Sequence, residues 1–306
     1  MYKRQHGQWL GLDPAGERHG TIGATISTAS SGPLAHAFGT PRDLVLGLDA
    51  VTGYGETVRP GGRVVKNVAG FDLVRLFTGS WGTLGPITSI TLRLRALPLH
   101  DVTLAIALDE PAQLPALLPA LLHALRQPTL SLLACEWVDG ATSRALGISD
   151  GRDAVLVRVG GNDSFVRGQR GVLNTLASCQ PCDPAVWGTL SLLDAGAVAV
   201  IRVSGSVSEL PARITRLRQA SSSDTVRVAM HASLSRGLVR VIVTGAVNPV
   251  RAALQGLHDG EQRIPERLPN DWWATEPDPF GVGLAGRIRS AFDPHALCNP
   301  RMAANA

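Results

Sequence analysis

Residues 61–94 read GGRVVKNVAGFDLVRLFTGSWGTLGPITSITLRL, and this stretch carries the densest structural pattern in the chain. Asp72 stands where a helix N-cap would, and Leu73, Leu76 and Phe77 follow it at helical spacing. Gly79 then supplies a stop signal for a helix C-terminus. The pattern predicts a short helix between two extended segments.

A sharp turn and a strand are expected after this helix. Gly82 and Gly85 bracket the turn, and residues 90–95 alternate apolar and polar side chains, as a half-buried strand does. Ahead of the helix, Lys66 and Asn67 supply one cation and one amide in a glycine-containing segment. Such a segment suits a phosphate-bearing or polycyclic cofactor that lies on backbone amides.

Residues 20–33, upstream of this stretch, read GTIGATISTASSGP and contain almost no bulky side chain. Small residues let a backbone approach a ligand closely and offer hydroxyl and N–H groups to it. A flexible linker is the alternative, but Ile22 and Ile26 with the neighbouring threonines argue for packed structure. The residues favour a ligand-binding loop.

A hairpin is predicted between these two stretches, from an apolar strand at residues 44–51 and a returning strand at residues 56–59. Arg42 and Asp43 precede it. They fit either a surface ion pair of little energetic value or side chains that orient a loop against the glycine-rich segment.

Composition limits the class of protein. The 306 residues have room for about two domains, and 44% hydrophobic with 18% charged residues describe a soluble globular chain. A net charge of +4 and 5% aromatic residues argue against a nucleic-acid surface. No apolar run approaches the roughly 20 residues that cross a bilayer. Four cysteines are too few for a disulfide scaffold, so a reducing cytoplasm is expected.

From residue 101 onward, strand and helix patterns alternate over about 150 residues, which predicts an antiparallel sheet with helices on one face. Cys179 and Cys182 form a lone CxxC, interpreted as two incidental thiols in a loop because no further ligands are nearby. His231 lies among apolar residues and is interpreted as a core or edge histidine rather than a catalytic base. No HxH, HExxH, GxSxG, Walker A or GxGxxG pattern occurs, so no metal site, hydrolase, kinase or Rossmann site is predicted.

Six motifs in a fixed order resemble the FAD-binding domain of the vanillyl-alcohol-oxidase family, also called PCMH-type FAD-linked oxidases. They are Thr21-Ile22-Gly23, Ser31-Gly32-Pro33, Arg42-Asp43 with Val45-Leu46-Gly47, the run from Val65 to Leu73, Gly79-Ser80, and Gly82-Thr83-Leu84-Gly85 followed after one residue by Ile87-Thr88. The run KNVAGFDL at residues 66–73 and the closing FDPHALCNPRM at residues 292–302 are most similar to FAD-binding subunits of glycolate oxidases.

The resemblance implies FAD, held non-covalently between two subdomains, with a ferredoxin-like α+β cap domain over the flavin ring. It assigns no catalytic residue and no metal ligand. Lys66 and Asn67 are expected to shape the site more than to touch FAD. Carried over residue by residue, the resemblance predicts cofactor-binding positions at Thr21, Ile22, Gly23, Ser31, Gly32, Arg42, Asp43, Lys66, Asn67, Gly82 and Ile87.

The fold class expected from the resemblance is α+β. Residues 1–17 are expected to be irregular and not a natural start, because the family's first FAD subdomain would precede residue 18. The second FAD subdomain is expected at residues 18–99, the cap domain at 100–270, and a helix and tail that return to the FAD domain at 271–306. Ala24, Leu34 and Pro86 depart from the residues usual in the family.

The function implied is that of an FAD-binding subunit in a complex that oxidises glycolate to glyoxylate. Its partners would be a catalytic FAD-linked subunit and an iron–sulfur subunit, in the cytoplasm or peripherally at the inner face of the cell membrane. A self-sufficient D-lactate-type dehydrogenase is the alternative, weakened because the HGDGNxH-type segment of such enzymes is missing. A structural subunit without flavin remains a third reading.

Overall fold

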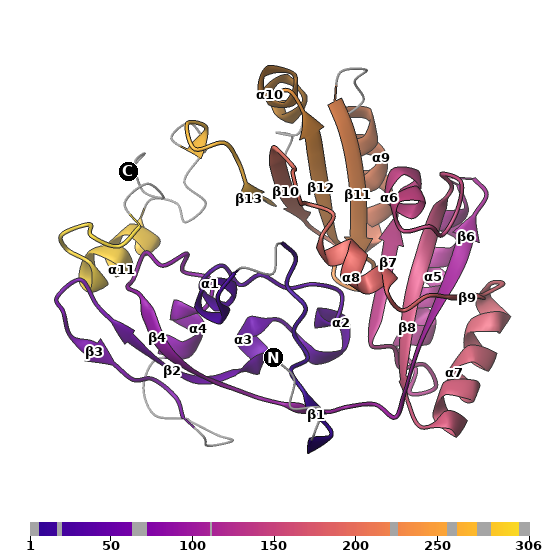
Figure 1. The fold of residues 1–306 in the computed structure, drawn as a ribbon, viewed down its shortest axis with the longest axis horizontal. Helices are drawn as coiled ribbons and strands as arrows, with labels where there is room; N and C mark the ends of the chain where they lie inside the picture. Colours follow the sequence, from indigo (N-terminus) through magenta and orange to yellow (C-terminus); the bar gives the residue numbers. More distant parts are fainter. Residues whose placement is uncertain are drawn as a thin grey trace. The chain divides into compact units, whose positions relative to one another are not determined.

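The computed structural model describes residues 6–16, 20–62, 72–110, 112–220, 226–255, 262–273 and 283–299 (Figure 1). The chain folds as two compact units, the first made of residues 1–97 and 269–306 and the second of residues 98–268. Each unit is built around an antiparallel sheet of its own.

The first unit holds a small sheet with the strand order β3-β2-β4 and a separate pair of strands, β1 and β5. One hydrophobic core, which includes Ile26, Leu48 and Phe77, joins the sheet to the helices. The elements are β1 (Gln8–Trp9), α1 (Ile22–Ser27), α2 (Ala35–Phe38), α3 (Pro41–Leu44), β2 (Val45–Val51), β3 (Thr57–Val58), α4 (Leu73–Phe77), β4 (Ile87–Leu92), β5 (Arg95–Ala96) and α11 (Leu284–Phe292).

The helix predicted after Asp72 is confirmed as α4. The Asp72 carboxylate accepts a hydrogen bond from the Arg75 N–H at 3.0 Å, and Gly79 follows the helix with a φ of 85°. The strand expected over residues 90–95 ends earlier, at Leu92. The chain leaves β4 there because Arg95 and the next residue pair with β1 in the other sheet.

The second unit is an eight-stranded antiparallel sheet, counted over the described residues, with the order β13-β10-β12-β11-β7-β8-β6-β9. Its elements are β6 (His100–Leu108), α5 (Gln113–Leu125), β7 (Ala134–Val138), α6 (Gly140–Ala145), β8 (Asp153–Gly161), α7 (Asp163–Leu176), β9 (Gln180–Cys182), α8 (Val186–Ser191), β10 (Ala199–Ser204), η2 (Val207–Glu209), α9 (Leu210–Ala220), β11 (Val226–Ser233), β12 (Leu238–Gly245), α10 (Val247–Gln255) and β13 (Gln262–Arg267).

This sheet contains two βαββαβ motifs side by side. The first runs β6-α5-β7-β8-α7-β9 and the second runs β10-α9-β11-β12-α10-β13. In both, the fourth strand lies beside the first, the first beside the third, and the third beside the second. This order confirms the ferredoxin-like α+β prediction, and it doubles the motif. The two halves meet where β7 pairs with β11.

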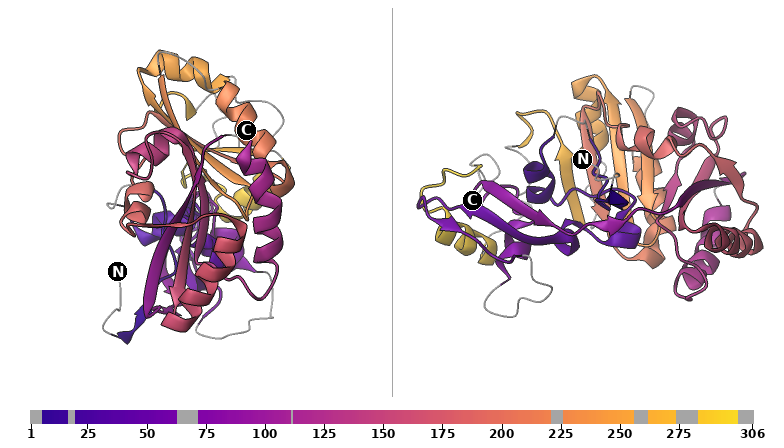
Figure 2. Two further views of the ribbon diagram at one scale, coloured as in Figure 1. Left: turned by 90° about the vertical axis from the view of Figure 1, so that its right-hand side faces the viewer. Right: turned by 60° about the horizontal axis from the view of Figure 1, so that its bottom comes forward.

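Helices cover both faces of the sheet, so the prediction of helices on one face is wrong. Trp137 and Val138 are consecutive on β7, so their side chains lie on opposite faces. The Arg218 guanidinium of α9 lies 5.1 Å from the Trp137 ring, whereas α8 packs in a core with Val138. Figure 2 shows helices on either side of this sheet. The short helix α8 was missed because its six residues leave little room for a periodic pattern.

Both edge strands of this sheet carry a proline, Pro181 on β9 and Pro265 on β13. Cys182 lies on one of these edge strands, β9, and not in the loop that the sequence predicts. Its partner in the CxxC, Cys179, lies just before the strand. All four cysteines, including these two, are free thiols.

The C-terminal segment packs on the first unit, as expected. Phe292 of α11 meets Phe77 edge to face, with ring centroids 5.5 Å apart. Phe292 and Ile288 join the core of the β3-β2-β4 sheet. The Phe292 carbonyl accepts a hydrogen bond from the Gly53 N–H at 2.8 Å.

Among the helices that the structure describes, none combines the length and the apolar character that crossing a membrane requires.

Candidate functional site

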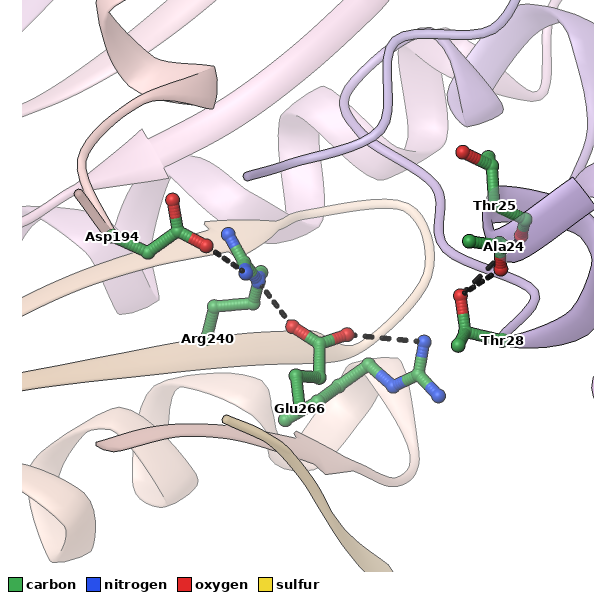
Figure 3. A network of polar contacts seen from close by, with 7 residues as sticks. Ala24, Thr25, Thr28, Asp194, Arg240 and Glu266 are labelled. Carbon is green, nitrogen blue, oxygen red and sulfur yellow. Dashed lines mark hydrogen bonds and ion pairs between the residues drawn. The ribbon is translucent and has the colours of Figure 1, made fainter. Parts of the chain in front are cut away.

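Helix α1 forms where the sequence predicts a ligand-binding loop. The Thr21 hydroxyl caps it by accepting a hydrogen bond from the Ala24 N–H at 3.1 Å. At the other end, the Thr28 hydroxyl donates to the Ala24 carbonyl at 2.8 Å (Figure 3). Ile26 is fully buried and anchors the helix, while Ile22 is exposed. Two threonine hydroxyls thus supply hydrogen bonds at the two ends of a helix that has only six residues.

Three of the predicted cofactor positions come together around the start of α1. A Cβ atom built on Gly23 would lie 3.7 Å from the Thr21 hydroxyl and 3.9 Å from the Ile87 carbonyl. These are ordinary contact distances, so packing within the chain does not require glycine at position 23. A side chain at position 23 would therefore lie in van der Waals contact with Thr21 and Ile87, which shows that these three residues lie close together.

The loop after α4 lies against the end of α1. The Gly79 N–H donates to the Ile26 carbonyl at 3.0 Å, and the Trp81 N–H donates to the Ser27 carbonyl at 2.7 Å. Trp81 has a φ of 56°, which is rare for an aromatic residue, and its carbonyl accepts from the Asn299 side chain at 2.7 Å. These contacts on both sides hold the loop in a conformation that its sequence alone would not favour.

Two glycines of this loop meet different surroundings. A Cβ on Gly85 would lie 2.0 Å from the Val51 carbonyl oxygen, so packing requires glycine there. A Cβ on Gly82 would meet nothing within 4 Å, and Gly82 has a φ of 72°. Gly82 therefore presents backbone that is open where a side chain would stand.

The Ser31–Gly32 turn is filled from within the chain. A Cβ on Gly32 would lie 1.9 Å from the Asp13 carbonyl oxygen. Both carboxylate oxygens of Asp13 accept the Leu34 N–H, at 3.1 Å each. The anion nearest this turn is Asp13, and a cofactor contact at Ser31 or Gly32 stays a prediction.

Arg42 and Asp43 both have structural partners. The Arg42 Nε donates to the Thr78 carbonyl at 3.3 Å, which ties α3 to the end of α4. Asp43 accepts from the N–H and the hydroxyl of Thr40 at 2.8 and 2.9 Å and closes a capping box on its own helix. Of the two readings left open by the sequence, these contacts favour side chains that orient the loops. Lys66 and Asn67 lie outside the described residues.

Asp293 anchors the C-terminal segment beside the turn after β2. Burial raises the pKa of its carboxyl, but hydrogen bonds from the N–H groups of Cys298 at 2.7 Å and Leu297 at 3.0 Å outweigh burial and hold the pKa below its usual range. A Cβ on Gly53 would lie 2.3 Å from an Asp293 carboxylate oxygen, so the two segments fit tightly.

The second unit contains a buried polar cluster that sequence reasoning missed. Arg240 donates from Nε to Glu266 at 2.6 Å and from Nη2 to Asp194 at 3.4 Å (Figure 3). Nearby in the sheet, the His231 Nδ1 lies 3.0 Å from a carboxylate oxygen of Glu136. A charged residue in the middle of an apolar strand, as in ACEWV at 134–138, is the signal that could have identified the cluster.

Of the predicted site residues, the structure brings Thr21, Gly23 and Ile87 together and leaves Gly82 open. The open backbone at Gly82 fits a flat, phosphate-bearing cofactor such as FAD, which approaches the main chain closely. The turn at Gly32 is already filled. Among the described residues, no three His, Cys, Asp or Glu side chains gather as metal ligands.

Known proteins match parts of the chain. A family model described as an FAD binding domain matches residues 2–61. The mitochondrial D-lactate dehydrogenase [cytochrome] of Arabidopsis thaliana is 45% identical over 101 residues, which are 33% of this chain and 18% of that protein. The glycolate oxidase subunit GlcE of Escherichia coli (strain K12) is 41% identical over 100 residues, 32% of this chain and 28% of that protein. The chain thus matches less than a third of the length of these relatives.

Solved structures share the fold over most of this chain. An alkyldihydroxyacetonephosphate synthase superposes with a TM-score of 0.66 at 15% identity, over 97% of this chain and 61% of that one. The 4-ethylphenol oxidase of Gulosibacter chungangensis superposes with a TM-score of 0.65 at 14% identity, over 92% of this chain and 69% of that one. At such low identities the similarity shows the fold alone. The chain therefore has the fold of the PCMH-type FAD-binding oxidases, and its residues 2–61 are similar to an FAD binding domain.

Proposed function

We propose that this chain is the FAD-binding subunit of a complex that oxidises a small 2-hydroxy acid, glycolate in the first instance, to the 2-oxo acid. The observation that carries the proposal is the open backbone at Gly82, together with the close approach of Thr21, Gly23 and Ile87 to one another. Its support is a similarity of about 40% to a glycolate oxidase subunit over about 100 residues.

Each predicted contact has a defined part in this proposal. Thr21 fixes the first turn of α1, so that the N–H groups of that turn point in one direction. Gly23 and Gly82 let the cofactor approach the main chain, and Ile87 supplies backbone from β4. When bound, FAD accepts the two electrons that leave the substrate. The residues of this chain bind the cofactor and orient it.

The proposed partners are a catalytic FAD-linked subunit and an iron–sulfur subunit that receives the electrons. The proposed location is the cytoplasm, with the complex at the inner face of the cell membrane. Four free thiols are in keeping with a reducing compartment. These statements rest on the likeness to a subunit of a multi-subunit oxidase.

A self-sufficient D-lactate-type dehydrogenase is the second candidate. The observation in its favour is the 45% identity to the Arabidopsis D-lactate dehydrogenase. The two candidates differ in whether the chain turns over substrate without partners.

The test is the visible absorption of the purified chain titrated with FAD, followed by dye reduction with glycolate or D-lactate. We expect bound, red-shifted flavin, and glycolate-dependent reduction only when the partner subunits are added. Gly82→Ala should weaken FAD binding about tenfold. Gly147→Ala is the matched control, because Gly147 also has a left-handed φ, 68°, and a Cβ there also meets nothing within 4 Å, but the residue lies in the second unit. A chain that never binds FAD would overturn the proposal, and turnover of D-lactate by the chain alone would favour the second candidate.

A further inference from the structure

The loop after α4 contains a turn to which one of its central residues is poorly suited. Trp81 has a φ of 56° and Gly82 a φ of 72°. The Thr83 N–H donates to the Ser80 carbonyl at 3.1 Å and closes the turn. Two consecutive left-handed residues inside such a hydrogen bond define a type I′ turn, whose first central position favours glycine or asparagine. An aromatic residue there is strained, so other parts of the chain must stabilise this conformation.

Contacts from two directions hold Trp81. Its N–H donates to the Ser27 carbonyl at the end of α1, and its carbonyl accepts from Nδ2 of Asn299, each at 2.7 Å. Its indole ring lies with its centroid 6.0 Å from that of Trp273. All of these residues belong to the first unit. The peptide group before Trp81 is therefore fixed by α1, and the peptide group after it is fixed by the C-terminal segment.

The peptide group between Trp81 and Gly82 is held at its carbonyl and free at its N–H. A trans peptide is planar, so its carbonyl and its N–H point in opposite directions. Asn299 holds the carbonyl, and no described residue accepts a hydrogen bond from the Gly82 N–H. A Cβ on Gly82 would meet nothing within 4 Å. Asn299 thus fixes the direction of a backbone donor whose residue is open to a ligand.

The segment that carries Asn299 is internally hydrogen-bonded. The Asp293 carboxylate accepts from the N–H groups of Leu297 at 3.0 Å and Cys298 at 2.7 Å. Arg289 of α11 donates to the Cys298 carbonyl at 3.3 Å. These bonds tie residues 293–298 to the end of α11, which packs on the core of the first unit. The Asn299 side chain therefore reaches the turn from an anchored base.

We propose that Asn299 is a positioning residue for the cofactor. It holds the Trp81–Gly82 turn in its left-handed conformation, so that the Gly82 N–H donates to an acceptor atom of FAD. This inference rests on the proposed function and adds a residue that itself touches no cofactor. Without the hydrogen bond from Asn299, Trp81 leaves the left-handed region more often, because that region is unfavourable for an L-residue with a side chain. The apparent dissociation constant of FAD rises as the fraction of chains with the binding-competent turn falls.

The experiment is titration of the full chain with FAD, followed by visible absorption, for the wild type and Asn299→Gly. Asn299 has a φ of 46°, which glycine adopts without strain, so the substitution removes the side-chain donor alone. We expect the dissociation constant of FAD to rise about fivefold. His295→Ala is the control, because His295 is exposed in the same segment, and it should leave FAD binding unchanged.

A second substitution separates positioning of the turn from anchoring of the C-terminal segment. Trp81→Asn places at the first central position a residue that adopts the left-handed conformation readily. In that background the turn needs no support, so Asn299→Gly should change FAD affinity by less than about twofold. Trp81→Phe keeps an aromatic residue at this position. In its background Asn299→Gly should still weaken FAD binding about fivefold.

Two results would overturn the positioning role. The first is an FAD affinity that Asn299→Gly leaves unchanged. The second is an equal loss of affinity in the Trp81→Asn and Trp81→Phe backgrounds, which would show that Asn299 only anchors the segment. Asn299 is exposed, so its variants should fold, and circular dichroism checks this. A wild-type chain that binds no FAD overturns the proposed function and the positioning role together. A wild type and an Asn299→Gly variant that bind FAD equally overturn the positioning role alone.

Discussion

The two glycines of the loop after α4 differ in what surrounds them, and substitutions at them should separate folding from cofactor binding. Gly85→Ala would force a Cβ to within 2.0 Å of the Val51 carbonyl oxygen, at a φ of 138°. We expect it to lower the free energy of unfolding by more than about 3 kcal/mol or to prevent folding. Gly82→Ala meets open space and should cost only about 1–2 kcal/mol for its left-handed backbone. Denaturant titration measures both, and equal losses would show that the open backbone at Gly82 has been misjudged.

The carboxylate of Asp293 should make the C-terminal segment sensitive to acid. Because hydrogen bonds hold its pKa below the usual range despite burial, its stabilisation is present above the pKa of the unfolded chain. It is lost as the pH falls through the folded value. Asp293→Asn should cost about 1–3 kcal/mol at pH 7, and the difference from the wild type should shrink toward pH 3.

Thermal unfolding followed as a function of pH measures this effect. Asp150→Asn, at an exposed position, is the control and should change little at any pH. A difference between Asp293→Asn and the wild type that stays constant down to pH 3 would contradict the assigned role of the carboxylate.

Helix α1 depends on its cap more than on its length. It has six residues, and the Thr21 hydroxyl satisfies one of its first N–H groups. Thr21→Ala should lower the free energy of unfolding by about 1 kcal/mol, whereas Thr21→Ser keeps the hydroxyl and should restore most of it. Urea denaturation compares the three proteins. A serine variant as unstable as the alanine variant would show that the methyl group, not the cap, matters.

The strands around Arg240 depend on charge pairing. Arg240→Met would leave the buried Asp194 without its partner and the half-buried Glu266 with Arg202 alone, which should cost about 3–5 kcal/mol. The matched control is Arg152→Met, since Arg152 pairs with Asp109 at an exposed site where a salt bridge is worth about 0–1 kcal/mol. Denaturant midpoints of both variants give the comparison, and similar losses would contradict a buried pairing of Arg240 with these two carboxylates.

Elements with a complete local signal could be predicted from the sequence. Helix α4 has its cap at Asp72 and its stop at Gly79, so its existence and position follow from nearby residues. Strand β9 has three residues and a proline at its centre, which reads as a loop. It is a strand because β6 offers it an edge. Local propensity does not contain that information.

The candidate site could be predicted only where its chemistry is local. Gly23 and Gly82 lie in motifs that are visible in the sequence. The contact of Asp13 with the turn before α2 joins segments that local patterns do not connect. The pair of Glu136 and His231 forms because β7 and β11 are neighbours, and strand order is a property of the whole sheet.

For the whole molecule, cysteine labelling should report unfolding of the second unit. Burial raises the pKa of the Cys135 thiol far above its usual range, and Glu136 adds to the effect. The thiolate is the reactive form, so Cys135 should stay unlabelled in the native protein and react at the rate of unfolding. Burial also raises the pKa of Cys179 and Cys182, though both are partly exposed, so they should react slowly but without unfolding. Mass spectrometry after timed alkylation separates them, and early modification of Cys135 would contradict this picture.

The prolines on β9 and β13 restrict how this molecule assembles with others. A strand added to either end of the large sheet would need backbone N–H donors, and Pro181 and Pro265 each remove one. Growth of the sheet from chain to chain, the route to fibrils and to swapped dimers, is therefore discouraged at both ends. In the proposed complex, we expect other subunits to recognise this unit mainly through side chains on its helices and loops. The choice of partner in the proposed complex would then depend on surface residues, which can change during evolution without disturbing the sheet.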